Sequence, residues 1–340
     1  MAFAKEKTDF GSGLPQIKIL ATGGTIAGKG KESAQMTEYT PGAIGIKELI
    51  DAVPEIKEYA CISGEQIANI GSYAMTDDVW LKLADRINNL LSVDNVDGIV
   101  ITHGTDTMEE TAYFLNLVIK SKKPVILTGS MRPATAMSAD GPLNLLNAVR
   151  LAASKEAHGK GVLVCMNDQI NCAREVTKSN TTNVETFKAT DFGCLGLIQN
   201  GKPYFYRQST RRHTINSEFD ISALKNLPRV NIIYAHASDD RALTDAAVAA
   251  GAKGIVHAGM GYGNMFPLVK DALSDARKKG IVVVKSSRTG SGLVPRTDAD
   301  NEFDFVTGDN LISQKARILL MLALTVTNDA AQIQRIFDEY

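Results

Sequence analysis

The chain has 340 residues, of which 44% are hydrophobic and 22% are charged, and its formal net charge at pH 7 is −1. A chain of this length exceeds one typical hydrophobic core, so we expect two domains. The near-neutral charge gives no electrostatic reason to expect a nucleic acid or a membrane as a partner. No apolar run in the sequence is long enough to span a bilayer.

The amino terminus and the cysteines bear on the compartment and on metal binding. Residues 1–13 lack the apolar core of a signal peptide, and we expect them to form a flexible lead. Two hypotheses remain, a cytoplasmic protein or a mature exported protein without its signal. The four cysteines show no C-x-x-C spacing and no histidine-rich neighbourhood, so we expect no metal site.

Two short apolar runs in the first half of the chain are each followed by a turn that contains glycine and threonine. Residues 17–21 and 98–101 are typical of strands buried on both faces, and the turns are residues 22–28 and 102–107. In open α/β sheets, ligands bind at the carboxyl ends of the strands. We therefore expect both turns to line one site.

Helical patterns alternate with these runs. Residues 77–91 have apolar side chains at helical spacing after two aspartates, and a second helix is expected to begin near Met108. The alternation restarts late in the chain. There we expect strands at 230–234, 254–257 and 280–284, and helices at 242–250 and 268–278.

This alternation predicts an α/β fold with two domains, each a largely parallel sheet flanked by helices. We expect an N-terminal α/β catalytic domain at 14–208, a polar linker at 209–228 and a C-terminal α/β domain at 229–340.

The residue types in the two turns indicate nucleophilic chemistry by a hydroxyl group. A threonine hydroxyl needs a base or proton relay within hydrogen-bond reach, and donors aimed at the developing oxyanion. Asp106 offers a carboxylate, and Lys178 offers a cation. Each also has a plain structural interpretation. Thr25 and Asp106 could each cap a helix, and Lys178 could be an ordinary solvated lysine.

The motifs together resemble those of bacterial-type L-asparaginases, specifically the periplasmic type II branch. The resemblance extends from Leu14 to Tyr340 and is dense and ordered along the chain. The segments that carry it, besides the two turns, are 64–66, 129–133, 138–142, 162–168, 213–214, 286–288 and 315–319.

The resemblance implies a set of catalytic residues. Thr25 would be the primary nucleophile on a mobile loop, and Tyr39 on the same loop would polarise its hydroxyl group. Thr105, Asp106 and Lys178 would form a second, rigid triad.

The resemblance also implies a substrate pocket. Ser72 and Asp106 would hold the α-carboxylate and α-ammonium groups of an amino acid. In most relatives, the residue after this serine is Gln or Glu, where this chain has Tyr73. The complete expected substrate-binding set is Gly24, Gly71, Ser72, Tyr73, Gly104, Thr105, Asp106 and Ser130.

The activity implied is hydrolysis of L-asparagine to L-aspartate and ammonia through an acyl-enzyme, with no metal or cofactor. A homotetramer with active sites at an intimate dimer interface and a periplasmic location are also implied. A dual glutaminase-asparaginase is the nearest alternative, and the asparaginase-like subunit of archaeal tRNA-dependent amidotransferases is more distant. An alternative from another class is a catalytically silent amino-acid-binding protein. In the second domain, Tyr262 occupies a position where relatives carry Asn or Ser.

The segment after the first turn, residues 28–35, is polar and contains two glycines. Such a segment makes few buried contacts, so it is a candidate lid that assembles Thr25 and Tyr39 on closure.

Overall fold

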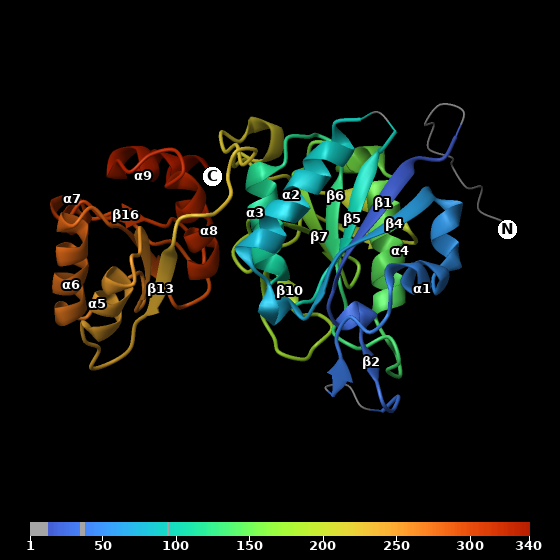
Figure 1. The fold of residues 1–340 in the computed structure, drawn as a ribbon, viewed down its shortest axis with the longest axis horizontal. Coiled ribbons are helices and arrows are strands. Elements are labelled where there is room, and N and C mark those ends of the chain that lie inside the picture. Colours follow the sequence, from blue (N-terminus) through green and yellow to red (C-terminus); the bar gives the residue numbers. More distant parts are fainter. Residues whose placement is uncertain (1–12, 35–37, 94) are drawn as a thin grey trace. The chain divides into compact units, whose positions relative to one another are not determined.

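The computed structural model describes residues 13–34, 38–93 and 95–340, and most of the expected lead at 1–13 lies outside this part (Figure 1). The chain divides into two compact units, Met1–Thr210 and Arg211–Tyr340.

A central sheet organises the first unit. Within the described residues it has eight strands in the order β12-β11-β8-β7-β6-β5-β1-β4. The pairings from β4 through β1, β5 and β6 to β7 are parallel, whereas β8, β11 and β12 continue the sheet in antiparallel fashion. The strands are β1 (Gln16–Gly23), β4 (Cys61–Ile70), β5 (Gly98–Thr102), β6 (Val125–Thr128), β7 (Val162–Met166), β8 (Gln169–Cys172), β11 (Gly196–Gln199) and β12 (Lys202–Phe205).

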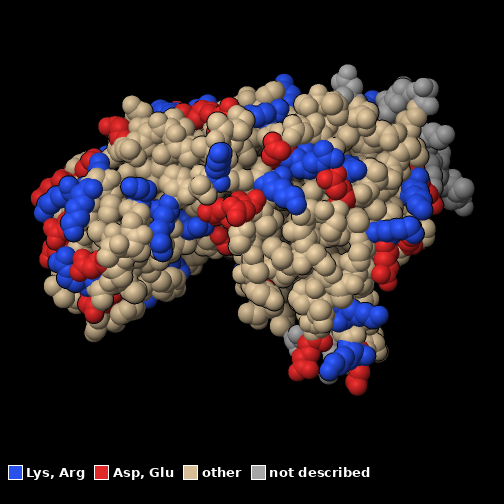
Figure 2. Space-filling view, in the orientation of Figure 1, with Lys and Arg blue, Asp and Glu red and all other residues tan. Residues whose placement is uncertain are grey.

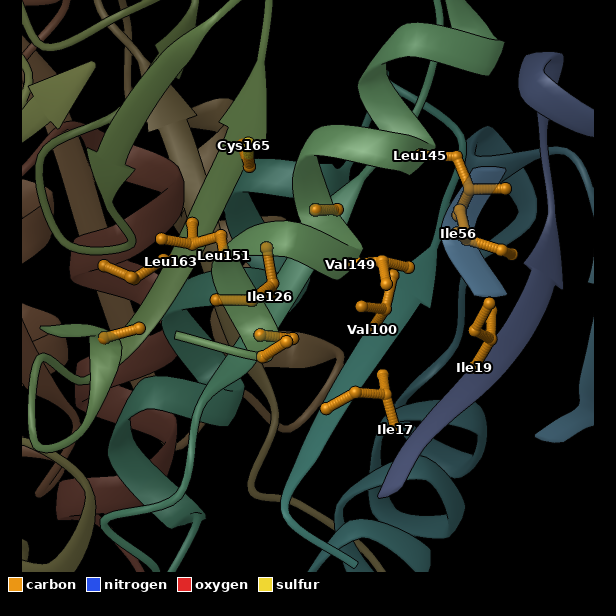
Figure 3. Packing of buried hydrophobic residues seen from close by; sticks show 14 of the residues in the cluster. Ile17, Ile19, Ile56, Val100, Ile126, Leu145, Val149, Leu151, Leu163 and Cys165 are labelled. Atoms are coloured by element: carbon orange, nitrogen blue, oxygen red, sulfur yellow. The ribbon is translucent and has the colours of Figure 1, made fainter. Parts of the chain in front are cut away.

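The main core of this unit lies between the parallel strands and a helix. Ile19, Val100 and Ile126 project from three strands toward Leu145 and Val149 of α4, and all five side chains are fully buried (Figure 3). Because alternate residues of a strand face opposite sides, the same strands bury their other side chains under further helices. The helices of this unit are α1 (Ile46–Asp51), α2 (Asp77–Leu91), α3 (Met108–Val118) and α4 (Gly141–Ala152).

Short elements connect the larger ones. Two short antiparallel ribbons are formed, one by β2 (Lys29–Gly30) and β3 (Tyr39–Thr40) and the other by β9 (Thr177–Lys178) and β10 (Phe187–Lys188). The 3₁₀ turns are η1 (Thr25–Ala27), η2 (Pro54–Glu58), η3 (Ser72–Ala74), η4 (Lys155–Ala157) and η5 (Thr214–Asn216).

The second unit contains a parallel sheet in the order β13-β14-β15-β16. Its core packs Ile233, Ile255 and Val283 of the sheet against Val269 and Leu273 of α6. Its strands and helices are β13 (Val230–Tyr234), β14 (Gly254–Gly259), β15 (Val282–Ser287), β16 (Val306–Thr307), α5 (Ala242–Ala249), α6 (Pro267–Lys278), α7 (Asp298–Glu302), α8 (Ser313–Ala323) and α9 (Ala330–Glu339).

The segment 211–228, assigned to the linker in the sequence analysis, packs within the second unit. Phe219 is fully buried, and its ring centroid lies 5.0 Å from that of Tyr340 at the end of α9. Glu218 forms an ion pair with Arg335. Residues before β13 therefore contribute to the core of this unit.

The α/β fold class with largely parallel sheets is confirmed, as are the strands and helices expected from the apolar patterns. The antiparallel part of the first sheet was not expected. No helix in the described part of the chain has the length and apolar character required to cross a bilayer. Positive and negative side chains are interspersed on the face shown in Figure 2, in agreement with the near-neutral net charge.

Candidate active site

The two glycine turns meet at the carboxyl ends of β1 and β5. These neighbouring strands pair up to Ala21 and Thr102, so their turns begin side by side. A Cβ atom added to Gly24 would lie 2.3 Å from the backbone nitrogen of Gly104, and Gly24 has a φ of +80°. Glycine is therefore required at this contact for both steric and conformational reasons. The contact brings the Thr25 and Thr105 turns together.

The Thr25 hydroxyl is buried and paired. Thr25 lies in η1, is 6% exposed, and its Oγ1 is 2.7 Å from Tyr39 Oη. Tyr39 comes from β3, and its ring packs against the backbone of Gly28, where an added Cβ would lie 2.7 Å from Tyr39 Cδ2. The hairpin of β2 and β3 thus places a phenol beside the threonine hydroxyl.

Thr105 has a different partner. Lys178 Nζ donates hydrogen bonds to Thr105 Oγ1 at 2.9 Å and to Asp106 Oδ1 at 2.7 Å. The side chain of Lys178 is 17% exposed and that of Asp106 is 54% exposed. The structure thus brings the three residues of the expected triad into contact. It leaves part of the Asp106 carboxylate accessible to another cation.

The end of β4 supplies Ser72 to the same site. The hydroxyl of Ser72 accepts a hydrogen bond from the Asp106 N–H at 3.1 Å, and Thr107 Oγ1 donates to the Ser72 carbonyl at 2.8 Å. A Cβ atom on Gly104 would lie 2.5 Å from Ser72 Oγ, so the Ser72 side chain packs directly against the Gly104 backbone. Ser72 therefore lies against the turn that carries Thr105 and Asp106.

Tyr73 follows Ser72 and is largely exposed. Its side chain has 75% of its surface accessible, and its ring lies beside Gly71, where an added Cβ would be 2.4 Å from Tyr73 Cε1. The phenol therefore lies at the solvent-facing rim of the Ser72 turn. Tyr262, in the second unit, is 56% exposed.

Ser130 is buried, and its hydroxyl is already occupied. Its Oγ donates to the Arg132 carbonyl at 2.7 Å. Asp140 braces the same loop by accepting hydrogen bonds from the Met131 and Arg132 N–H groups, each at 2.9 Å. Any ligand contact by Ser130 in this conformation is therefore expected from its backbone.

The loop that carries η1 is tied to the Ser130 loop. The Ala134 N–H donates to the Gly28 carbonyl at 3.0 Å, and the Gly30 N–H donates to Thr135 Oγ1 at 2.9 Å. In the lid expected at 28–35, residues 31–34 are exposed, and residue 35 lies outside the described residues. The Met137 N–H also donates to the Ser33 carbonyl at 2.8 Å, so the described part of this loop is anchored near both of its ends.

His103 lies beneath the site in a continuous hydrogen-bond chain. Trp80 Nε1 donates to Thr111 Oγ1 at 2.8 Å, which lies 2.9 Å from His103 Nε2, and His103 Nδ1 is 2.7 Å from the Gly104 carbonyl. Because a carbonyl only accepts and an indole only donates, the neutral ring is protonated at Nδ1. Burial lowers the pKa of His103 to about 4. This histidine orients a backbone carbonyl and remains neutral.

Sequence reasoning missed two acidic residues that support the site. Glu109 accepts a hydrogen bond from the backbone N–H of Lys178, and Asp140 braces the Ser130 loop. Glu109 lies in a helix of which every residue except Glu110 is buried, and a carboxylate in such a helix could have been a signal. Within the described residues, no group of three or more His, Cys, Asp and Glu side chains could hold a metal ion.

The arrangement has the parts needed for acyl transfer. Two hydroxyl groups lie on abutting glycine turns, and each contacts a group that can accept or donate a proton.

Comparison with known proteins agrees with this geometry. Residues 16–211 match the family described as "Asparaginase, N-terminal", and residues 229–337 match the "Glutaminase/Asparaginase C-terminal domain".

Individual relatives match over nearly the whole chain. L-asparaginase 2 of Bacillus subtilis is 54% identical, covering 100% of this chain and 89% of the relative. A protein of Haemophilus influenzae named "Probable L-asparaginase periplasmic" is 51% identical, covering 96% and 93%. The crystal structure of a probable cytoplasmic L-asparaginase from Campylobacter jejuni superposes with a TM-score of 0.94 at 51% identity, covering 96% of this chain and 100% of that chain.

Relatives with a broader name also match. A glutaminase-asparaginase of Pseudomonas fluorescens biotype A is 48% identical, covering 96% of this chain and 91% of the relative. Both family matches and the full-length identities agree on one assignment. The chain belongs to the asparaginase family, in its bacterial type II branch.

Proposed function

We propose that this protein hydrolyses L-asparagine to L-aspartate and ammonia, with Thr25 as the nucleophile and an acyl-enzyme intermediate. The observation that supports this most is the pair of threonine hydroxyls on abutting turns, one beside Tyr39 and one beside Lys178. Family membership and the names of the relatives support the substrate.

In the first half-reaction, Thr25 Oγ1 attacks the side-chain amide carbon of asparagine. The hydroxyl proton passes to the leaving nitrogen through the Tyr39 phenol, and the carbon–nitrogen bond breaks to release ammonia. An aspartyl ester on Thr25 remains. The 2.7 Å contact between the two hydroxyl groups is short enough for this proton transfer.

In the second half-reaction, water attacks the ester carbonyl. Thr105, held by the hydrogen bond from Lys178, orients the water and relays its proton to Thr25 Oγ1 as the ester bond breaks, which restores the threonine hydroxyl. The 2.9 Å hydrogen bond from Lys178 to Thr105 supports this role. L-aspartate then leaves.

The substrate's α-ammonium group pairs with Asp106, whose carboxylate is half exposed. Its α-carboxylate lies at Ser72 and at the amino terminus of α3, where N–H groups and the helix dipole favour an anion. Backbone groups of Gly24, Gly71, Gly104 and Ser130 complete the pocket.

A dual glutaminase-asparaginase is the second candidate. L-glutamine has one more methylene, a difference worth about 1–3 kcal/mol in a pocket. The relative named glutaminase-asparaginase, which is 48% identical over nearly the whole chain, is the observation that supports this alternative.

The decisive experiment measures ammonia release with L-asparagine, L-glutamine and D-asparagine in parallel, with Thr25→Ala as the control. Turnover of L-asparagine well above L-glutamine that is lost in the variant would support the proposal. Comparable rates would favour the dual enzyme, and no release would favour an amino-acid-binding protein. Wild-type-like turnover by Thr25→Ala would exclude Thr25 as the nucleophile.

We also propose a homotetramer built from intimate dimers with active sites at the dimer interface, and a periplasmic location, with a cytoplasmic location as the alternative. The names of the relatives include both compartments. Sedimentation equilibrium tests the assembly, since a monomer at micromolar concentration would contradict it. Cell fractionation of the native host tests the location.

A further inference from the structure

We propose that Glu109 is a positioning residue for Lys178 that holds the backbone of the lysine while Asp106 holds its ammonium group. This inference rests on the proposed role of Lys178. Glu109 lies in the first turn of α3 and is 5% exposed. Its Oε2 accepts a hydrogen bond of 2.5 Å from the Lys178 N–H.

The turn before α3 and the first turn of that helix thus contact the two ends of the same lysine. Asp106 lies just before Thr107, the N-cap of α3, and Glu109 lies in the first turn of the helix. Asp106 accepts from Nζ at 2.7 Å, and Glu109 accepts from the backbone N–H. The position of Nζ relative to Thr105 Oγ1, 2.9 Å away, therefore depends on the short segment from Asp106 to Glu109.

The segment around Lys178 needs such an anchor. β9 has two residues and pairs with the two residues of β10, and the next residue, Ser179, donates from its N–H to the Thr186 carbonyl at 2.8 Å. Such a short ribbon fixes one side of the backbone. The Glu109 carboxylate binds its other side.

The helix that supplies the anchor is rigidly packed. Every residue of α3 except Glu110 is buried, and Phe114 stacks on Trp80 with ring centroids 5.2 Å apart. Thr105 lies on the turn that leads into α3. This turn and the helix together carry the Thr105 hydroxyl and Glu109, which anchors its partner Lys178. Through its hydrogen bond, Glu109 links the Lys178 backbone to this closely packed helix.

Proton transfer depends steeply on this geometry. A shift of about 1 Å in a reacting group can reduce a rate by about a hundredfold. Loss of the anchor is therefore expected to lower kcat, while KM changes little because Glu109 is placed behind Lys178 and outside the proposed substrate contacts.

Three substitutions separate the reach of the side chain from its charge. Glu109→Gln keeps an acceptor at the same length and removes the charge, whereas Glu109→Asp keeps the charge and shortens the side chain. Glu109→Ala removes both. With L-asparagine as substrate, we expect kcat within about threefold of wild type for Gln and about 10- to 100-fold lower for Asp and Ala, with KM within about threefold in all three. Glu110→Gln, at the next position of α3, is the matched control.

The pattern of results decides between the alternatives. Wild-type kcat in Glu109→Asp with a loss in Glu109→Gln would overturn the anchor and assign the effect to charge. Equal kcat in all variants would also overturn it, as would a loss that follows only the unfolded fraction measured by circular dichroism. If Glu109→Ala does not fold, the Gln and Asp variants still decide. An inactive wild-type protein would contradict the proposed function itself, which is a separate outcome.

Discussion

At the residue scale, the two threonine hydroxyls differ in what contacts them. Thr25 has a neutral phenol beside it, and Thr105 has an ammonium group that also binds a carboxylate. A phenol can relay a proton without a change of net charge around the bond that breaks. An ammonium group instead stabilises negative charge that develops on its neighbour. This difference supports the division of labour proposed for the two half-reactions.

The first prediction concerns Tyr39. Tyr39→Phe keeps the ring that packs against Gly28 and removes the hydroxyl group at 2.7 Å from Thr25. Because the proton relay is lost, we expect kcat for L-asparagine to fall by about a hundredfold with little change in the melting temperature. Steady-state ammonia release measures this, with Tyr206→Phe, an exposed tyrosine, as the control. A kcat within twofold of wild type would remove Tyr39 from the relay.

A second residue-scale prediction concerns a buried ion pair in the second unit. Lys285 Nζ lies 2.6 Å from Asp300 Oδ2, and both side chains are less than 10% exposed. Burial alone would raise the pKa of Asp300, but hydrogen bonds from Lys285 and Thr297 hold it below its usual value. Lys285→Met would leave the carboxylate buried without its cation, and we expect a loss of about 3–5 kcal/mol of stability.

Scanning calorimetry of the single variant, of Asp300→Asn and of the double variant tests this second prediction. The double variant should recover part of the loss, because it leaves no unpaired charge. Strictly additive losses would show that the two residues do not act as a pair.

At the scale of elements, β5, its turn and α3 form one braced unit. The hydrogen-bond chain from Trp80 of α2 through Thr111 of α3 to His103 ends on the Gly104 carbonyl. The carbonyl that His103 holds belongs to the same peptide group as the Thr105 N–H. In a planar trans peptide group the C=O and N–H bonds point in opposite directions. A hydrogen bond that fixes the carbonyl therefore also fixes the direction of this N–H. The buried network thereby orients a backbone donor at the site.

The third prediction is the pH dependence that follows from this burial. The pKa of His103 falls from 6.5 to about 4 on folding, so the unfolded chain binds more protons between these values. The contribution of His103 to the free energy of unfolding is therefore complete above pH 6.5. It falls by roughly 3 kcal/mol as the pH falls toward 4. Burial also lowers the pKa of His257 to about 4, and it acts in the same direction.

Urea unfolding of wild type and His103→Gln between pH 4 and pH 7.5 measures this effect. The variant should lose stability less steeply as the pH falls. His236→Gln, at an exposed histidine, is the control and should keep the wild-type slope. Identical slopes for wild type and His103→Gln would contradict the assignment.

At the scale of the whole molecule, each unit has its own sheet and its own buried cluster. The second unit includes residues before its first strand, because Phe219 packs on Tyr340 and Arg212 pairs with Glu339. The family match to the carboxyl-terminal domain begins only at residue 229. Sequence similarity and the packed unit thus differ in where the second domain begins.

The fourth prediction tests this boundary. A fragment of residues 211–340 should unfold cooperatively, and a fragment of residues 229–340 should melt at least about 5 °C lower, because burial of Phe219 contributes about 2 kcal/mol. Circular dichroism melting curves of the two fragments measure the difference. Equal melting temperatures would show that residues 211–228 add nothing to the stability of this unit.

The elements predicted best were those with local signals. α2 begins as expected because Thr76 caps it by accepting from the Val79 N–H, and two aspartates follow in its first turn. β1 and β5 were evident as apolar runs because both of their faces are covered. The short strands β8, β11 and β12 carry no comparable run, and they are defined by antiparallel pairing, of β8 with β7 and β11 and of β11 with β12.

By itself, the sequence determined the residue types of the candidate site and the strands and turns that carry them, since apolar runs and glycine turns are local patterns. Only the tertiary structure decided which of these residues meet. Lys178 reaches Thr105 across 73 positions of sequence, and Ser72 reaches Asp106 across 34. The burial of Glu109 against the Lys178 backbone also depends on that packing. Such contacts follow from the order of strands in the sheet, which is set by the burial of whole strands and helices and leaves no mark on any single segment.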